Sequence, residues 1–384
     1  MRLFPNRRPV SAFSLLVAVL ALGVLLAGCG VPGTIPTAAP LRSVTALPSP
    51  TPLPPVRFPQ DEAPHSNLTE WWYYTGHLHG TDATGHAHQY GFELTFFQTL
   101  RGPFTPYYAA HFAVSDLTRQ QFHYDQRAAF EPLSVITPAG TTSGFDITLA
   151  DWAARGLGGH DTLRATMQDY AIALSLSTNR PPALEGGNGI ITYGQAGFSY
   201  YYSRPLMRVA GTLTDHGAPV TVTGQAWMDH QWGNFVSLAG AGWDWYSIQL
   251  DNDTQYMVYI IRDAQKRPLS TVGTAIASDG SARAIAGSAI TSQALSTWTS
   301  PRTGGVYPSG WRLSAGSQQG LALTLTPLLR DQELVTAQST GVAYWEGAVS
   351  VRGTLDGRPV SGQGYVELTG YASVPGGSAG VSVP

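Results

Sequence analysis

Residues 224–250 place four of the ten tryptophans of the chain beside one histidine and two aspartates. Successive side chains of a β-strand point to opposite faces of its sheet. In the first half of this segment, His230 and Trp232 are therefore expected on one face, with Trp227 and Asp229 on the other. An apolar hollow with a few ionisable groups at its wall is the usual form of a small-molecule site. The segment is thus the first candidate for chemistry.

The second half of the segment repeats the pattern. Asp244 and Tyr246 share one face, opposite Trp243 and Trp245. A carboxylic acid in an apolar wall stays neutral and can donate a proton, because burial raises its pKa. Asp244 is the first candidate for such an acid, and Asp229 is the second.

The neighbouring side chains would complete an acid-catalysed addition of water to a carbon-carbon double bond. The imidazole of His230 has a pKa suited to deprotonating water, and Tyr246 could hold that water. A tryptophan ring stabilises a nearby cation by about 0.5 to 2 kcal/mol when water is excluded, and Trp232 and Trp245 are the candidates. The competing interpretation is that each polar side chain is a hydrogen-bonded structural residue.

Short strands must position these residues. The chain of 384 residues is 43% hydrophobic and only 12% charged, with 43 Gly and 27 Pro, which favours an all-β globular protein. Segments 70–80 and 86–97 read as one hairpin, and 243–250 and 255–262 as another. Further strands are predicted at 145–152, 197–202, 208–214, 341–353 and 359–371, among others. No segment has the periodicity of a long amphipathic helix.

Several functional classes are excluded or unsupported. The net charge of -3 and the pI near 6.3 provide no basic surface for nucleic acid. The sequence has no phosphate-loop or HExxH motif, and no GxSxG elbow between a strand and a helix is predicted. Four histidines, His77, His79, His86 and His88, flank the turn of the first hairpin, but no cysteine or acidic residue completes a familiar ligand set. We therefore expect neither a metal nor a cofactor.

The N-terminus carries an export signal. Three arginines precede an apolar run at 11–26 that is too short for a comfortable membrane span. Residues 26–29, Leu-Ala-Gly-Cys, resemble a bacterial lipobox, which predicts a signal peptide over 1–28 and a lipid on Cys29, the only cysteine. Residues 29–60 are rich in Pro, Thr and Ser and read as a semi-rigid tether. We expect an extracytoplasmic protein that is anchored to a membrane of the cell envelope through Cys29.

Five motifs together resemble one family. They are Glu70-Trp71-Trp72-Tyr73-Tyr74-Thr75-Gly76, residues 90–97 (YGFELTFF), residues 227–233 (WMDHQWG), residues 344–347 (YWEG) and residues 364–371 (GYVELTGY). In this order they are similar to the AttH-like and carotenoid 1,2-hydratase (hydroxyneurosporene synthase) family. The similarity spans nearly everything after the tether.

The resemblance implies two packed lipocalin-like antiparallel β-barrels, which we expect over 61–238 and 239–375, followed by a flexible tail at 376–384. It also implies an apolar ligand of isoprenoid or carotenoid type and hydration without a cofactor. His230-Gln231-Trp232 fits the His-x-Trp pair of the hydratases, whereas Asp244-Trp245-Tyr246 carries their second pair in reversed order. Trp72 and Glu93 of the shared motifs join the tryptophans as expected ligand contacts.

Two other functions remain open. A non-catalytic carrier of a lipid or pigment needs the aromatic cavity but no acid. A structural or adhesion module needs no sizeable cavity. Hydration by the proposed groups requires Asp244 or Asp229 within hydrogen-bond reach of His230, or of a water that they share, inside a closed pocket.

Overall fold

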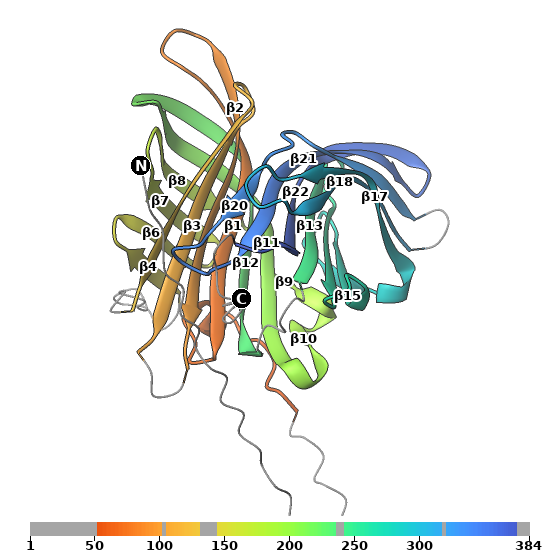
Figure 1. Cartoon of the computed structure of the whole chain (residues 1–384). Helices are drawn as coiled ribbons and strands as arrows, with labels where there is room; N and C mark the ends of the chain where they lie inside the picture. Colours follow the sequence, from red (N-terminus) through yellow and green to blue (C-terminus); the bar gives the residue numbers. More distant parts are fainter. Residues whose placement is uncertain (1–51, 102–104, 131–143, 236–241, 317–319, 375–384) are drawn as a thin grey trace, which may run out of the picture. The chain divides into compact units, whose positions relative to one another are not determined.

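Alternating apolar and polar side chains build β-strands over most of the described chain (Figure 1). The computed structural model describes residues 52–101, 105–130, 144–235, 242–316 and 320–374. These residues belong to one unit that begins at Leu53. The signal peptide, Cys29, most of the tether and the tail lie outside the described residues.

The prediction of an all-β fold is confirmed. The helices of the described segments are single 3-10 turns, η1 (Gln60–Glu62), η2 (Glu185–Gly187), η3 (Gly194–Ala196) and η4 (Gly287–Ala289). In the same segments no helix has the length and apolar character needed to cross a bilayer.

The first sheet has twelve antiparallel strands, in the order β4-β3-β2-β1-β12-β11-β8-β7-β6-β5, with β9 and β10 paired to β11. These strands are β1 (Thr69–Thr81), β2 (Ala87–Thr99), β3 (Tyr107–Asp116), β4 (Gln121–Ala129), β5 (Phe145–Leu149), β6 (Trp152–Leu157), β7 (His160–Thr166), β8 (Tyr170–Ser177), β9 (Ala183–Leu184), β10 (Ile190–Thr192), β11 (Gly197–Asp215) and β12 (Ala218–Phe235). The end strand β5 lies against β3 and β4. The sheet is thus a nearly closed barrel around one apolar core.

The second sheet has ten antiparallel strands, in the order β16-β15-β14-β13-β22-β21-β19-β18-β17, with β20 paired to β21. They are β13 (Gly242–Leu250), β14 (Gln255–Arg262), β15 (Pro268–Ile276), β16 (Ala282–Ile285), β17 (Ile290–Thr299), β18 (Val306–Ala315), β19 (Leu321–Pro327), β20 (Glu333–Val335), β21 (Ala343–Leu355) and β22 (Arg358–Ala372). This sheet forms a half-barrel with its own core.

A third group of side chains packs between the two sheets, and we call this region the seam. It is built around Tyr73, Tyr201, Trp227, Trp245, Tyr259 and Tyr365. The strands that meet there are β1 with β22, β2 with β21, and β11 with β13. Because side chains alternate along a strand, each of these strands supplies one set of residues to its own sheet's core and the other set to the seam.

Local backbone chemistry explains the hairpins. The turn between β11 and β12 has positive φ at His216 and Gly217, the geometry of a type I′ turn. Both hairpins predicted from the sequence, 70–80 with 86–97 and 243–250 with 255–262, are confirmed by the strand pairing.

Two strand predictions were wrong in detail. Segments 197–202 and 208–214 belong to one strand, β11, in which the pairing with β12 shifts between Arg204 and Met207 and so accommodates Pro205. Segment 145–152 contains a turn instead of a single strand, because Ala150 adopts positive φ between β5 and β6. The first sheet ends at Phe235 and the second begins at Gly242. The domain boundaries proposed from the sequence stay a prediction.

Candidate active site at the seam between the sheets

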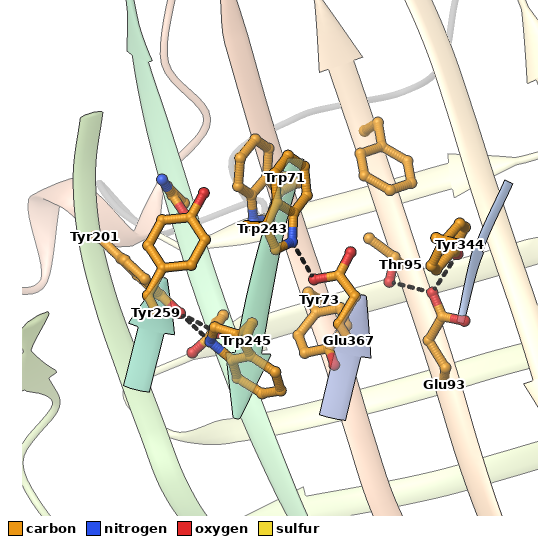
Figure 2. Close-up of a pocket in the computed structure, with 13 residues that line it drawn as sticks. Trp71, Tyr73, Glu93, Thr95, Tyr201, Trp243, Trp245, Tyr259, Tyr344 and Glu367 are labelled. Carbon is orange, nitrogen blue, oxygen red and sulfur yellow. Dashed lines mark hydrogen bonds between the residues drawn. The ribbon is translucent and has the colours of Figure 1, made fainter. Parts of the chain in front are cut away.

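A cavity of about 40 Å³ lies in the seam (Figure 2). Its wall consists of aromatic and acidic side chains with a few neutral polar ones: Trp71, Tyr73, Glu93, Thr95, Phe97, Tyr201, Asp229, Gln231, Trp243, Trp245, Tyr259, Tyr344 and Glu367. A water molecule needs about 10 to 15 Å³ of such space. In this state the cavity therefore accommodates a few waters or the small reacting end of a larger ligand.

Asp229 enters the wall from β12 because alternate residues of that strand face the seam. Its Oδ1 accepts hydrogen bonds from Trp227 Nε1 at 2.6 Å and from Ser203 Oγ at 2.5 Å, and its Oδ2 accepts one from Tyr201 Oη. Trp245 Nε1 in turn donates to Tyr201 Oη at 2.9 Å. These donors hold the Asp229 carboxyl in place at the wall of the cavity.

The serine beside Asp229 shows that a proton is shared there. Ser203 Oγ lies 2.7 Å from Glu185 Oε1 and 2.5 Å from Asp229 Oδ1, but the hydroxyl has only one proton to donate. One of the two carboxyl groups must therefore carry a proton and donate it to Ser203. Burial raises the pKa of Asp229 to about 7 and that of Glu185 to about 8, in agreement with this requirement.

Glu93 enters the wall from β2 on the other side of the cavity. Its Oε1 accepts hydrogen bonds from Tyr344 Oη and Thr95 Oγ1, both at 2.9 Å, while its buried Oε2 has no partner (Figure 2). Burial raises the pKa of Glu93 to about 7. Glu93, which the sequence analysis expected as a ligand contact, is a buried acid with 1% of its surface exposed.

Two more glutamates of the second sheet face the seam. Glu346 on β21 accepts a hydrogen bond from Tyr73 Oη at 2.9 Å, and Glu367 on β22 accepts one from Trp243 Nε1 at 2.8 Å. Burial, together with the charge of Glu93, raises the pKa of Glu346 well above its usual range. Burial raises the pKa of Glu367 to about 8.

No cation compensates these acids, since none of the thirteen residues of the cavity wall is Lys, Arg or His. Close carboxyl groups cannot all ionise in an apolar environment, so protons remain bound to some of them near neutral pH. The site can therefore offer a proton to a weakly basic group, such as a carbon-carbon double bond, from inside an aromatic pocket. This is the chemistry that the sequence suggested, although different acids would perform it.

His230 and its aromatic neighbours lie in the core of the first barrel and not in the seam. His230 Nε2 is hydrogen-bonded to Glu70 Oε1 at 2.7 Å, and its ring stacks on Trp72 at 4.9 Å between centroids. Trp232 stacks on the half-buried ring of His65 at 4.0 Å. The predicted alternation along β12 is seen, but it separates His230, Trp232 and Trp72 from Asp229 and the cavity.

The group His65, Glu70 and His230 has the composition of a metal site. However, Glu70 Oε1 lies 2.8 Å from His65 Nδ1 and 2.7 Å from His230 Nε2, which are hydrogen-bond distances. Ligand atoms about 2.0 to 2.2 Å from a tetrahedral zinc ion would lie farther apart than this. The geometry favours a proton over an ion between these atoms, so the group reads as a structural hydrogen-bonded cluster.

Asp244 and Tyr246 face the core of the second sheet and not the seam, so they lie apart from the cavity wall. Asp244 is paired with Arg262, whose Nε lies 2.9 Å from Asp244 Oδ1, and it also accepts a hydrogen bond from Tyr371 Oη. Tyr246 Oη is hydrogen-bonded to Ser292 Oγ at 2.9 Å. Neither residue shares a hydrogen bond with His230, because β13 directs its even-numbered side chains away from the seam. In the described structure, the side-chain partners of His230 are Glu70 and Tyr202, and neither Asp244 nor Asp229 is hydrogen-bonded to it.

Of the expected ligand contacts, Trp243, Trp245 and Glu93 line the cavity, and Trp227 supports Asp229 from behind. Sequence reasoning missed Glu346, Glu367, Tyr73, Tyr201 and Tyr344. All but Tyr201 occur in the motifs that carried the family resemblance. An acid placed between apolar residues of a strand was the signal that could have found the two glutamates.

Comparisons with known proteins agree with this architecture. Residues 49–371 match the AttH-like family. A crystal structure from Nitrosomonas europaea that carries the AttH designation is 34% identical, with a TM-score of 0.72 over 84% of this chain and 99% of that one. No curated protein matches the sequence.

Two more distant structures share the fold. Kievitone hydratase from Nectria haematococca is 19% identical, with a TM-score of 0.65 over 84% of this chain and 94% of that one. The protein CghA, solved with Sch210972, is 12% identical, with a TM-score of 0.52 over 80% of this chain and 89% of that one. At these identities the similarity establishes the fold alone.

Proposed function

The chain belongs to the AttH-like family, and from this premise we propose that it binds an apolar, isoprenoid-like molecule at the seam and adds water across a carbon-carbon double bond without a cofactor. The observation that carries the proposal is the unpartnered Oε2 of Glu93 beside an aromatic cavity. A neutral carboxylic acid with a pKa of about 7 is well matched to proton donation at neutral pH. The fold shared with a hydratase is consistent with this chemistry.

The two carboxyl groups of the cavity take different roles because their hydrogen bonds differ. Asp229 accepts three hydrogen bonds, which favour its anion, whereas Glu93 has one oxygen free to present a proton. Glu93 transfers its proton to one alkene carbon, and the electron pair of the double bond forms the new C–H bond. A water molecule attacks the other carbon and gives its proton to Asp229, which releases that proton to water in the cavity after the alcohol has left. The alkene and water thus become an alcohol.

The spacing of the strands places Glu93, the proton donor, and Asp229, the proton acceptor, at different ends of the cavity. Tyr73 of β1 pairs with Asp229 of β12 on one side and with Thr95 of β2 on the other, and Glu93 lies two residues from Thr95. With strands about 4.8 Å apart and residues about 3.3 Å apart along a strand, the Cα atoms of Glu93 and Asp229 are on the order of 12 Å apart. Their side chains therefore reach a ligand from opposite ends, and the rings of Tyr73 and Trp245 lie where a cation would form.

The size of the cavity defines what can enter. Only the reacting end of a ligand fits in about 40 Å³. The half-buried rings of Trp71, Phe97 and Trp243 line the same cavity and offer an apolar surface to the rest of the molecule. A long isoprenoid would therefore contact these rings while its terminal double bond reaches Glu93.

The test is incubation of the purified protein with an acyclic carotenoid such as lycopene in ¹⁸O-labelled water, followed by mass spectrometry. We expect a labelled alcohol from the wild type. Glu93→Gln and Asp229→Asn should each lower the rate by about 10² or more, the scale of a lost general acid or base. Asp253→Asn, in an exposed turn of the second sheet, is the matched control and should keep the wild-type rate.

Two results would contradict the proposal. Turnover that persists in Glu93→Gln but is lost in Asp244→Asn would restore the acid first suggested by the sequence. A bound polyene that is recovered unchanged from the wild type would identify a carrier.

A further inference from the structure

A line of hydrogen-bonded side chains leads from Glu93 away from the cavity. Tyr344 Oη lies 2.9 Å from Glu93 Oε1 and 2.7 Å from His111 Nδ1. The other ring nitrogen, His111 Nε2, lies 3.0 Å from Ser339 Oγ, which lies 2.7 Å from Gln126 Oε1. The line crosses from β2 to β21 and back to β3, so it joins both sheets.

The line runs from the interior to the surface. Glu93, His111 and Tyr344 are at most 3% exposed, whereas Ser339 is half-buried and adjoins the exposed Gln338. Ser339 lies in the segment between β20 and β21, whose fold is held by a hydrogen bond from Tyr107 Oη to the Ser339 carbonyl at 2.6 Å. Solvent can therefore reach one end of the line and the substrate the other.

The line has two arrangements of its protons, which differ by one proton. In the first, Glu93 is ionised and accepts from Tyr344, His111 Nδ1–H donates to Tyr344, and Ser339 donates to His111 Nε2, which leaves no proton between Ser339 Oγ and Gln126 Oε1. In the second, every donor is reversed: Glu93 is neutral and donates to Tyr344, His111 is the Nε2–H tautomer, and Ser339 donates to Gln126. Gln338 N–H donates to Gln126 Oε1 at 3.0 Å, which fixes this oxygen as an acceptor.

We propose that Ser339, His111 and Tyr344 form a relay that returns a proton from solvent to Glu93 after each turnover. This inference rests on the proposed function, in which Glu93 loses a proton to the substrate in every cycle. A proton from water binds Ser339 Oγ, Ser339 passes its own proton to His111 Nε2, His111 passes the Nδ1 proton to Tyr344, and Tyr344 passes its proton to Glu93. A half-turn of the Glu93 carboxyl then brings the proton from the Tyr344 side to the free position of Oε2. Rotation of the hydroxyls and exchange of the His111 tautomer reset the line, and no charge remains on it.

The surroundings favour a neutral relay. Burial lowers the pKa of His111 to about 3, so the ring stays neutral, and its face contacts Phe97 at 5.0 Å between centroids. The charged groups that face Glu93 and Tyr344 are Glu346 and Glu367 of the second sheet. Because both are acids, a proton that arrives at Glu93 is retained.

The test measures the relay without any substrate. The carboxyl C=O band of protonated Glu93 is followed by infrared spectroscopy after a rapid drop in pH, and the band is assigned by its loss in Glu93→Gln. We expect His111→Phe and Ser339→Ala to slow proton uptake by about 10²-fold, the scale of a lost proton-transfer group, with the midpoint of the titration unchanged. His77→Phe and Ser350→Ala are matched controls that lie outside the line, and they should keep the wild-type rate.

Three other results would contradict the relay or the proposed function. Wild-type uptake rates in both His111→Phe and Ser339→Ala would overturn the relay and leave Glu93 as an acid that is protonated from the cavity. A shifted midpoint with an unchanged rate would show that His111 only supports the structure and would also overturn the relay. A Glu93 that stays ionised throughout would overturn the proposed function itself.

Discussion

The buried acids of the seam make the stability of the protein depend on pH. Glu185, which shares the Ser203 proton with Asp229, is fully buried, and its Oε2 has no partner. Burial raises its pKa from 4.5 to about 8, so between these values the folded protein binds a proton that the unfolded chain releases. This contribution to stability is complete below pH 4.5 and is lost as the pH rises to about 8.

We therefore expect the free energy of unfolding to fall between pH 6.5 and 8, where the buried histidines with lowered pKa values no longer titrate. Each shifted acid accounts for a slope of at most about 1.4 kcal/mol per pH unit. Glu185→Gln should flatten the slope, whereas the exposed Asp253→Asn should keep it. Urea unfolding at a series of pH values measures the effect. An equal slope in Glu185→Gln and the wild type would show that this acid titrates normally.

The sequence predicted which residues of a strand share a face, but not which face lines the cavity. Alternation placed Asp229 on the face opposite His230, and Trp243 and Trp245 opposite Asp244, as the structure confirms. Alternation shows which residues of a strand share a face, but not which face meets another sheet. It therefore could not show that Trp243 and Trp245 of β13 face the seam while Asp244 faces the core of the second sheet. Arg262, which neutralises Asp244, follows it by 18 positions and gave no local signal.

At the scale of elements, the close approach of the sheets depends on a glycine. A Cβ atom on Gly91 of β2 would lie 2.4 Å from Tyr365 Oη of β22 and 3.0 Å from Ala348 Cβ of β21. A larger residue at this position must displace the Tyr365 side chain or move these strands apart. The glycine lies in the second of the shared motifs, between Tyr90 and Phe92, and its role is to let two sheets touch.

Gly91→Val should therefore destabilise the protein by about 1 to 3 kcal/mol, the cost of overpacking a tight contact. Adding Tyr365→Phe removes the oxygen that the new side chain meets, so the double variant should recover part of the loss. Gln89→Val, at an exposed position of the same strand, should have little effect. Denaturant unfolding gives the five stabilities, those of the wild type, Gly91→Val, Tyr365→Phe alone, the double variant and Gln89→Val. Additive effects in the double variant would contradict a clash with Tyr365.

The element boundaries that the sequence missed have local causes. The sequence predicted separate strands at 197–202 and 208–214, yet the shift in pairing between Arg204 and Met207 carries β11 past Pro205. The turn between β5 and β6 uses positive φ at Ala150, a residue that gives no turn signal. In both cases pairing with neighbouring strands overrides the preference of the residue itself.

At the scale of the whole molecule, the site exists only because distant segments converge. Tyr344 and Glu93, which share a hydrogen bond, lie 251 positions apart, and Tyr73 and Glu346 lie 273 apart. The family resemblance indicated two packed barrels, and the sheets follow it as one nearly closed barrel and one half-barrel. The order of motifs along the chain could not show that the acids of the second, fourth and fifth motifs meet at one seam.

The cellular location of the protein depends on its N-terminal segment. We propose that the chain is anchored to the cell envelope through a lipid on Cys29, since the lipobox-like residues 26–29 follow an apolar run. Cys29→Ser should move the protein from the membrane fraction to the soluble extracytoplasmic fraction on cell fractionation. Its melting temperature should stay that of the delipidated wild type, because the described cores and the seam lie within the unit that begins at Leu53. Ala27→Ser, two residues before the cysteine, is a control that keeps the thiol. Membrane retention of Cys29→Ser at the wild-type level would exclude the lipid as the anchor and leave residues 11–26 to hold the chain.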